Sequence, residues 1–178
     1  MGGALESSLV DVFRDMLDGN ARYVETFPFG DLAAVPRRRL AIVTCMDCRI
    51  NPLAIFGFEP GDVHVMRNAG ARITPDMIRS LIKSVNQLEV ERIAIVHHTD
   101  CGAAKITLPG LRERVAAATG NDPSDVDFHL IDDQASAIDA DVEAVRTCPW
   151  LPVGTAVAGF LYDVSDGTIE AHRSTFVS

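Results

Sequence analysis

The chain has 178 residues, of which 47% are hydrophobic and 23% are charged, a composition typical of a globular domain with a sizeable core. Its formal net charge of −9 argues against a nucleic-acid surface, which needs clustered lysine and arginine. It contains no run of about 18 apolar residues, so we expect no membrane span. Because its first residues lack the basic and apolar regions of a signal peptide, we expect a cytoplasmic protein with reduced cysteines.

The N-terminal part of the chain shows first a helical pattern and then a strand pattern. Apolar residues recur at helical spacing over residues 5–27, which predicts an amphipathic helix that needs a surface to cover. The continuous apolar run over residues 40–43 is typical of a buried parallel strand. Asn51 and Pro52 begin a short predicted helix, which Gly57 ends.

The next segments alternate between strand and helix. One strand is predicted over residues 62–66 and another over residues 92–96, with a helix over residues 74–88 between them. Thr74 suits the N-cap of this helix because its side chain can accept a hydrogen bond from the first turn. Such alternation favours right-handed crossovers and a parallel sheet.

The C-terminal half is expected to be mainly helical before the chain returns to the sheet. A helix is predicted over residues 133–146 and a fourth strand over residues 155–164. An Asp-Gly pair at residues 166–167 predicts a tight turn into an edge strand near residues 169–172. The expected fold is a single α/β domain over residues 1–178, with a mostly parallel central sheet of four strands plus an antiparallel edge strand, flanked by helices.

Two short motifs follow the first and third predicted strands. They are Cys45-Met46-Asp47-Cys48-Arg49 and His98-Thr99-Asp100-Cys101. Because the carboxyl ends of parallel strands meet at one edge of a sheet, we expect the two motifs to converge there. Two thiolates and an imidazole suit zinc, and three protein ligands leave a fourth position for water. The motifs therefore predict a catalytic metal site.

The cysteines also allow uses other than a catalytic metal site. In a closed structural site, Cys48 would complete a shell with Cys45, His98 and Cys101. Such sites usually hold together small domains that lack a core, so we expect Cys48 to pack behind the metal. A redox Cys-x2-Cys pair is a further alternative, disfavoured by the Asp and Arg interleaved in the motif. Cys148 is expected to be a buried apolar residue.

The first motif also carries a pair of opposite charges. Asp47 and Arg49 lie two residues apart and can form a carboxylate–guanidinium pair. The plain alternative is a surface ion pair, which contributes little to stability. Beside zinc, the Asp47 carboxylate can instead accept a hydrogen bond from zinc-bound hydroxide and orient its attacking lone pair. His97 is expected to pack and not to ligate, because neighbours on an extended chain point to opposite faces.

Together with Arg67-Asn68-Ala69-Gly70 after the second predicted strand, these motifs resemble the β-class carbonic anhydrase family. The resemblance covers about residues 40–102, in the family's order and spacing. It implies one zinc ion per chain with three protein ligands, Cys45, His98 and Cys101. It implies a catalytic dyad, Asp47 and Arg49. It also implies homodimers, often paired into tetramers, in which the N-terminal helix packs on a partner subunit.

The implied reaction is the reversible hydration of carbon dioxide to bicarbonate and a proton by zinc-bound hydroxide. Gly102 is expected to offer its backbone N–H to the developing carboxylate oxygen. The alternative on the same scaffold is hydrolysis of carbonyl sulfide or carbon disulfide, and a non-catalytic zinc module is less favoured. Ile42 and Thr44 stand where regulated members carry Trp and Gly, so we do not expect their inhibitory bicarbonate pocket, although Arg67 matches its third member.

Overall fold

The structure, a computed structural model, describes residues 11–178. The chain divides into two compact units, one ending at Leu32 and the other running from Ala33 to Ser178. The first unit contains α2 (Arg14–Val24), which buries none of its side chains. The predicted N-terminal helix is thus confirmed over residues 14–24, and its predicted first residues, 5–10, lie outside the described part. Within residues 11–178, no helix combines the length and apolar character needed to cross a membrane.

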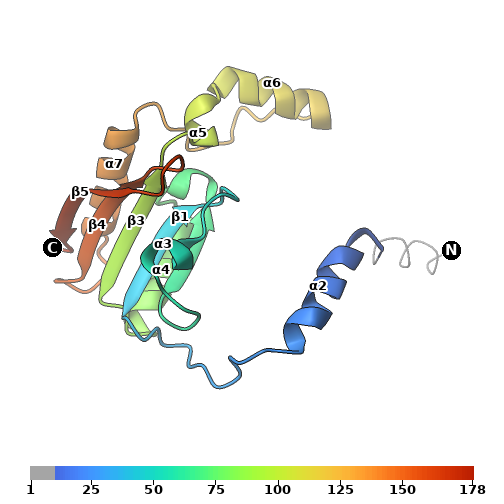
Figure 1. The fold of residues 1–178 in the computed structure, drawn as a ribbon. Coiled ribbons are helices and arrows are strands. Elements are labelled where there is room, and N and C mark those ends of the chain that lie inside the picture. Colours follow the sequence, from blue (N-terminus) through green and yellow to red (C-terminus); the bar gives the residue numbers. More distant parts are fainter. Residues whose placement is uncertain (1–10) are drawn as a thin grey trace. The chain divides into compact units, whose positions relative to one another are not determined.

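The second unit is built on one five-stranded sheet with the order β2-β1-β3-β4-β5 (Figure 1). Its strands are β1 (Leu40–Cys45), β2 (His64–Asn68), β3 (Arg92–His98), β4 (Ala156–Tyr162) and β5 (Ile169–Phe176). The first four strands are parallel, and β5 pairs antiparallel with β4. The expected fold class is confirmed, including the antiparallel edge strand.

The helical segments of this unit are α3 (Pro52–Phe56), the short 3-10 turn η1 (Ala69–Ala71), α4 (Pro75–Asn86), α5 (Gly102–Lys105), α6 (Leu108–Thr119) and α7 (Gln134–Arg146). Three helices, α3, α4 and α7, begin and end close to their predicted bounds, and the three further helical segments had no predicted bounds. Thr74 caps α4 by accepting a hydrogen bond from the Met77 N–H, and Asp133 caps α7 in the same way. Gly57 ends α3 in the left-handed conformation, with φ of 62°.

One face of the sheet is covered by α4 and α7, which bury the main core between them and the strands. Leu81 from α4 and Val142 from α7 are both fully buried there. The packing of α7 on β4 is so close that a Cβ added to Gly159 would lie 2.4 Å from the Ile138 Cγ2 atom and 2.9 Å from the Val142 Cγ2 atom. Glycine at position 159 therefore sets how near the helix lies to the sheet.

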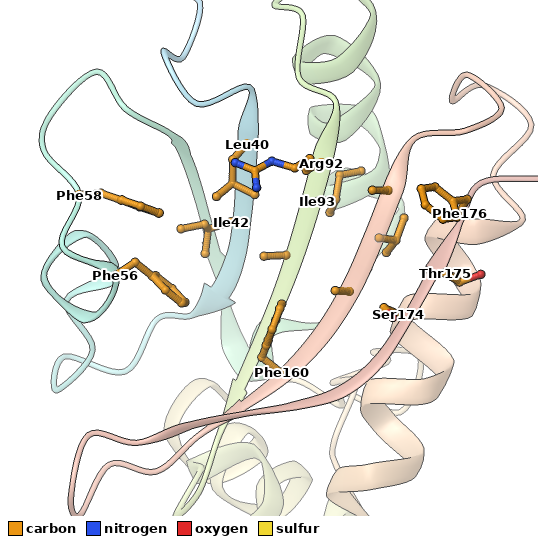
Figure 2. A pocket seen from close by; sticks show the side chains of 14 residues that line it. Leu40, Ile42, Phe56, Phe58, Arg92, Ile93, Phe160, Ser174, Thr175 and Phe176 are labelled. Atoms are coloured by element: carbon orange, nitrogen blue, oxygen red, sulfur yellow. The ribbon is translucent and has the colours of Figure 1, made fainter.

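The opposite face of the sheet carries an apolar groove of about 430 Å³ (Figure 2). Figure 2 shows Ile42 from β1 and Phe160 from β4 along its floor, with Phe56 and Phe58 on the side of α3. At the far side lies Phe176, whose side chain is 63% exposed. Large apolar side chains therefore remain open to solvent on this face of the unit.

The strand order also decides where a site can form. The chain runs from β1 outward to β2 and then crosses back to β3 on the other side of β1. The carboxyl ends of β1 and β3 therefore flank the point where the strand order reverses, which is where open α/β sheets bind ligands. Cys45 is the last residue of β1 and His98 is the last residue of β3.

Candidate metal centre

Three side chains that can bind a metal converge at this point of the sheet. The Sγ atoms of Cys45 and Cys101 and a ring nitrogen of His98 lie within 4.8 Å of one another, and all three residues are buried. The two sulfurs are 4.0 Å apart. Two thiolates at the usual ~2.3 Å from a tetrahedral zinc ion lie ~3.8 Å apart, so the observed spacing fits this metal.

The imidazole of His98 is oriented so that one ring nitrogen can bind the same metal ion. Its Nδ1 atom lies 2.8 Å from the Thr99 carbonyl oxygen, an acceptor that fixes the proton on Nδ1. The Nε2 atom then carries a lone pair, yet it is buried and has no hydrogen-bond partner within residues 11–178. A buried polar atom of this kind is costly unless a ligand satisfies it. A metal ion between Nε2 and the two sulfurs would do so.

The two neighbouring sulfurs shift each other's pKa in opposite directions. The contact with Cys101, more than any other, lowers the pKa of Cys45 to about 3, against the opposing effect of burial. The same contact raises the pKa of Cys101, because this sulfur keeps the proton beside a thiolate. The Gly70 N–H also donates to the Cys45 sulfur, at 3.3 Å. The site is thus ready to exchange a proton for a cation.

The remaining cysteines and the neighbouring histidine lie elsewhere. Cys48 does not belong to the metal-binding group, so the closed four-ligand arrangement is not formed among the described residues. Cys48 is exposed, so the expectation that it packs behind the metal is wrong. Cys148 lies in the main core, as expected. His97 is fully buried and its Nε2 atom lies 3.0 Å from Asp141, so it packs under the site.

Asp47 and Arg49 form the expected pair beside the metal-binding group. The Arg49 Nε donates to Asp47 Oδ1 at 3.0 Å, and the Nη2 donates to Oδ2 at 2.7 Å. The Arg49 backbone N–H also donates to Oδ1, at 2.9 Å. These bonds hold the pKa of Asp47 well below its usual range. Asp47 Oδ2 lies 3.9 Å from the His98 Nε2 and is therefore the carboxylate oxygen that faces the metal position.

Two further residues secure the loop that follows β1, and the sequence reasoning assigned neither of them this role. The Arg67 guanidinium donates to the backbone carbonyl of Cys45, at the end of β1, at 2.8 Å and to two carbonyls of the loop, those of Asp47 at 2.6 Å and Ile50 at 3.2 Å. Asp100, just before Cys101, accepts from the Arg49 Nη1 at 2.8 Å. The sequence signal for Asp100 was its place inside the second motif.

A cavity of about 350 Å³ opens beside the metal-binding group. Its lining is largely apolar, with Met46, Ala103, Ile106, Leu111, Phe128 and Leu130 among its residues. Gly102 also lines it, at the first position of α5. The groove of Figure 2 is larger, but it lies on the face of the sheet and lacks the metal-binding residues. The chemistry therefore belongs to the smaller cavity.

Comparison with known proteins agrees with this geometry. Residues 40–143 match the family model described as carbonic anhydrase. Beta-carbonic anhydrase 1 of Mycobacterium tuberculosis is 32% identical over 155 residues, which cover 87% of this chain and 94% of the relative. The chain belongs to the β-carbonic anhydrase family.

Relatives within the β-carbonic anhydrase family differ in their named substrates. The solved structure of a carbonic anhydrase from Streptococcus mutans is 35% identical, has a TM-score of 0.86, and matches over 90% of this chain and 97% of the other. A carbon disulfide hydrolase of an Acidianus strain is 28% identical, over 89% of this chain and 87% of the relative. The family assignment thus leaves two named activities to compare.

Proposed function

We propose that this β-carbonic anhydrase family member catalyses the reversible hydration of carbon dioxide to bicarbonate and a proton, with one zinc ion held by Cys45, His98 and Cys101. The observation that carries the proposal is the unpartnered, buried His98 Nε2 facing two buried sulfurs beside an apolar cavity. Zinc bound there supplies Lewis acidity that lowers the pKa of water to about 7, so a nucleophile is available at neutral pH.

Asp47 orients this nucleophile. Its Oδ1 atom is occupied by two N–H groups of Arg49, whereas its Oδ2 atom receives one and faces His98. Because Arg49 lowers the pKa of Asp47, the carboxylate stays ionised. An ionised carboxylate accepts hydrogen bonds and cannot donate them. Oδ2 therefore accepts a hydrogen bond from the nucleophile's O–H and turns the lone pair of that oxygen toward the cavity.

The cavity selects and holds the substrate. Carbon dioxide is small and apolar, and a largely apolar lining binds it without trapping the charged product. We propose that the Gly102 N–H stabilises the negative charge that develops on the substrate oxygen. An added Cβ at Gly102 would meet no heavy atom within 4 Å, so alanine at this position keeps the backbone N–H without a clash.

The proposal is tested by stopped-flow carbon dioxide hydration with the zinc-loaded protein. We expect turnover that rises with pH, and a large loss of kcat/KM in Asp47→Ala. The matched control is Asp76→Ala, an exposed acid that pairs with Arg79 and does not line the cavity. Full activity of Asp47→Ala would contradict the role of this carboxylate.

Gly102 has its own pair of variants. Gly102→Pro removes the N–H at the first position of a helix, where proline is tolerated. The preceding residue, Cys101, already has the extended backbone that proline requires, with φ of −70° and ψ of 134°. We expect kcat to fall about 10²- to 10³-fold in Gly102→Pro and to be retained in Gly102→Ala, which keeps the donor. Equal activities in the two variants would exclude the backbone role.

Hydrolysis of carbon disulfide is the second candidate, favoured by the named Acidianus relative and by the apolar lining of the cavity. The same zinc ligands and the same Asp47 would serve it. Release of hydrogen sulfide from carbon disulfide, with no carbon dioxide hydration between pH 7 and 9, would establish this alternative.

We further propose a homodimer or homotetramer in which the sheet domain is completed by α2 of a second copy. Four large apolar side chains of α2 are each more than half exposed: Met16, Leu17, Tyr23 and Val24. The groove of Figure 2 is an apolar surface of the sheet unit on which such a helix can pack.

We also propose that the protein is cytoplasmic, because the site depends on two free thiols and the cytoplasm keeps thiols reduced.

Sedimentation of the full chain tests the assembly. Leu17→Asp places a charge on the apolar side of α2, and we expect it to lower the mass of the particle. Asp15→Asn, on the same helix, should leave the mass unchanged. An unchanged mass in both variants, or a monomeric parent protein, would exclude the proposed contact.

A further inference from the structure

Arg49 contacts two carboxylates, and the mechanism above uses only one of them. Besides its bonds to Asp47, its Nη1 donates to Asp100 Oδ2 at 2.8 Å and its Nη2 donates to the Asp100 backbone carbonyl at 3.2 Å. Asp47 follows β1 and Asp100 follows β3, so one guanidinium joins the two segments that continue from the strands ending in Cys45 and His98. Its orientation is thus fixed from both sides.

Asp100 is itself held in a defined position. Its backbone is left-handed, with φ of 60°, a conformation that few residues other than glycine, asparagine and aspartate adopt readily. Lys105, from α5, forms an ion pair with Asp100 Oδ1, which leaves Oδ2 to face Arg49. The pairs with Lys105 and then with Arg49 lower the pKa of Asp100.

The charges of this cluster balance. Two carboxylates, Asp47 and Asp100, face two cations, Arg49 and Lys105. Because Lys105 provides the second positive charge, Asp100 can bind Arg49 without drawing it away from Asp47. The Arg49 side chain is 44% exposed, so water competes for its N–H groups, and the Asp100 carboxylate adds a restraint on the Nη1 atom, which does not contact Asp47.

We propose that Asp100 is a positioning residue, which acts through Arg49 to hold the Asp47 carboxylate in its orientation over the metal centre. This inference rests on the proposed function and adds a residue to it. Asp100 makes its contribution from the loop after β3, whereas the residues it aligns belong to the loop after β1. Asp100 therefore links the position of the segment after β3 to that of the loop after β1.

The test uses two variants chosen for the backbone of residue 100. Asp100→Gly removes the carboxylate without strain at positive φ, and Asp100→Asn keeps an oxygen acceptor and tolerates the same φ. We expect Asp100→Gly to lower kcat and kcat/KM together by about 10-fold, within the range for groups that support a metal site. We expect Asp100→Asn to stay within about threefold of the parent protein, as a conservative variant of a positioning residue should.

The chain contains a matched control at the other end of β3. Glu89 also has positive φ, at 60°, is exposed, and pairs through both its carboxylate and its carbonyl with an arginine, Arg39. Glu89→Gly thus repeats the change outside the metal centre. We expect it to leave kcat and kcat/KM within twofold of the parent values.

A second readout does not depend on catalysis. In the zinc-loaded protein, the Nε–H signal of Arg49 in 15N NMR spectra, assigned with Arg49→Lys, reports the bond to Asp47. We expect faster exchange with water and a shift of this signal in Asp100→Gly, but not in Asp100→Asn or Glu89→Gly. An unmoved Arg49 signal in Asp100→Gly, or unchanged kcat/KM, would overturn the inference.

Loss of stoichiometric zinc in both Asp100 variants would overturn it as well, since the role would then be structural. If the parent protein hydrates no carbon dioxide while the Arg49 signal still responds to Asp100→Gly, the proposed function fails and the positioning of Arg49 stands. The two claims are therefore separable in one set of samples.

Discussion

Replacing Asp141 with alanine should destabilise the protein strongly and loosen the floor of the metal centre. This carboxylate, only 3% exposed, accepts three hydrogen bonds. They come from Arg72 Nε at 2.8 Å, the Ile73 N–H at 2.9 Å and His97 Nε2 at 3.0 Å. Asp141 thereby ties α7 to the chain before α4 and to the residue next to His98.

The magnitude follows from what alanine would leave behind. The Arg72 side chain is 17% exposed and His97 is fully buried, so neither can turn to water for a replacement. Breaking a buried ion pair by removing one partner typically costs ~3–5 kcal/mol. In a chain of this size each kcal/mol lowers Tm by about 2–4 °C, so we expect Asp141→Ala to melt about 6–20 °C below the parent protein.

Thermal unfolding followed by circular dichroism measures this effect. Asp139→Asn is the matched control, because Asp139 lies on the same helix but its side chain is half-exposed. Its ion pairs with His172 and Arg173 are also longer, at 3.5 Å each. Such a pair contributes at most about 1 kcal/mol. A Tm for Asp141→Ala within 2 °C of the control would refute the argument that this buried network stabilises the fold.

Three other outcomes are expected. Gly159→Ala should cost ~1–3 kcal/mol in urea unfolding because the new methyl meets Ile138 at 2.4 Å, and adding Ile138→Val should recover part of the loss. Zinc analysis should find one ion per chain in Cys48→Ser but a deficit in Cys45→Ser, and the reverse pattern would mean that the ligand assignment is wrong. The pKa of Asp62 is lowered to about 2 in the folded state, first by a hydrogen bond from the Glu59 N–H and then by nearby arginines. In the unfolded chain the pKa of this carboxyl is about 3.9. Its stabilising contribution is therefore present above pH 4 and is lost as the pH falls toward 2, and acid titration of Asp62→Asn should lack this step.

The elements of the fold could be predicted because their signals are local. Thr74 accepts a hydrogen bond from its own helix, and Gly57 ends α3 through its own left-handed backbone. Strand ends depend on neighbouring strands, and here the predictions fell short. β1 and β3 each extend two residues beyond their predicted ends, because Cys45 pairs with Asn68 and His98 with Tyr162. Cys45 and His98 are therefore strand residues and do not lie in the loops that follow.

The residue types and spacing of the two motifs define the candidate ligands and the carboxylate–guanidinium pair, and with them the chemistry available to the site. The folded chain selects which cysteines converge, because Cys45 and Cys48 are equally suitable ligands by residue type and differ in their burial. It also decides that Asp100 faces Arg49 across 51 residues of chain, a contact that depends on the parallel pairing of β1 with β3. Long-range contacts of this kind follow from strand order and packing, which no local pattern encodes.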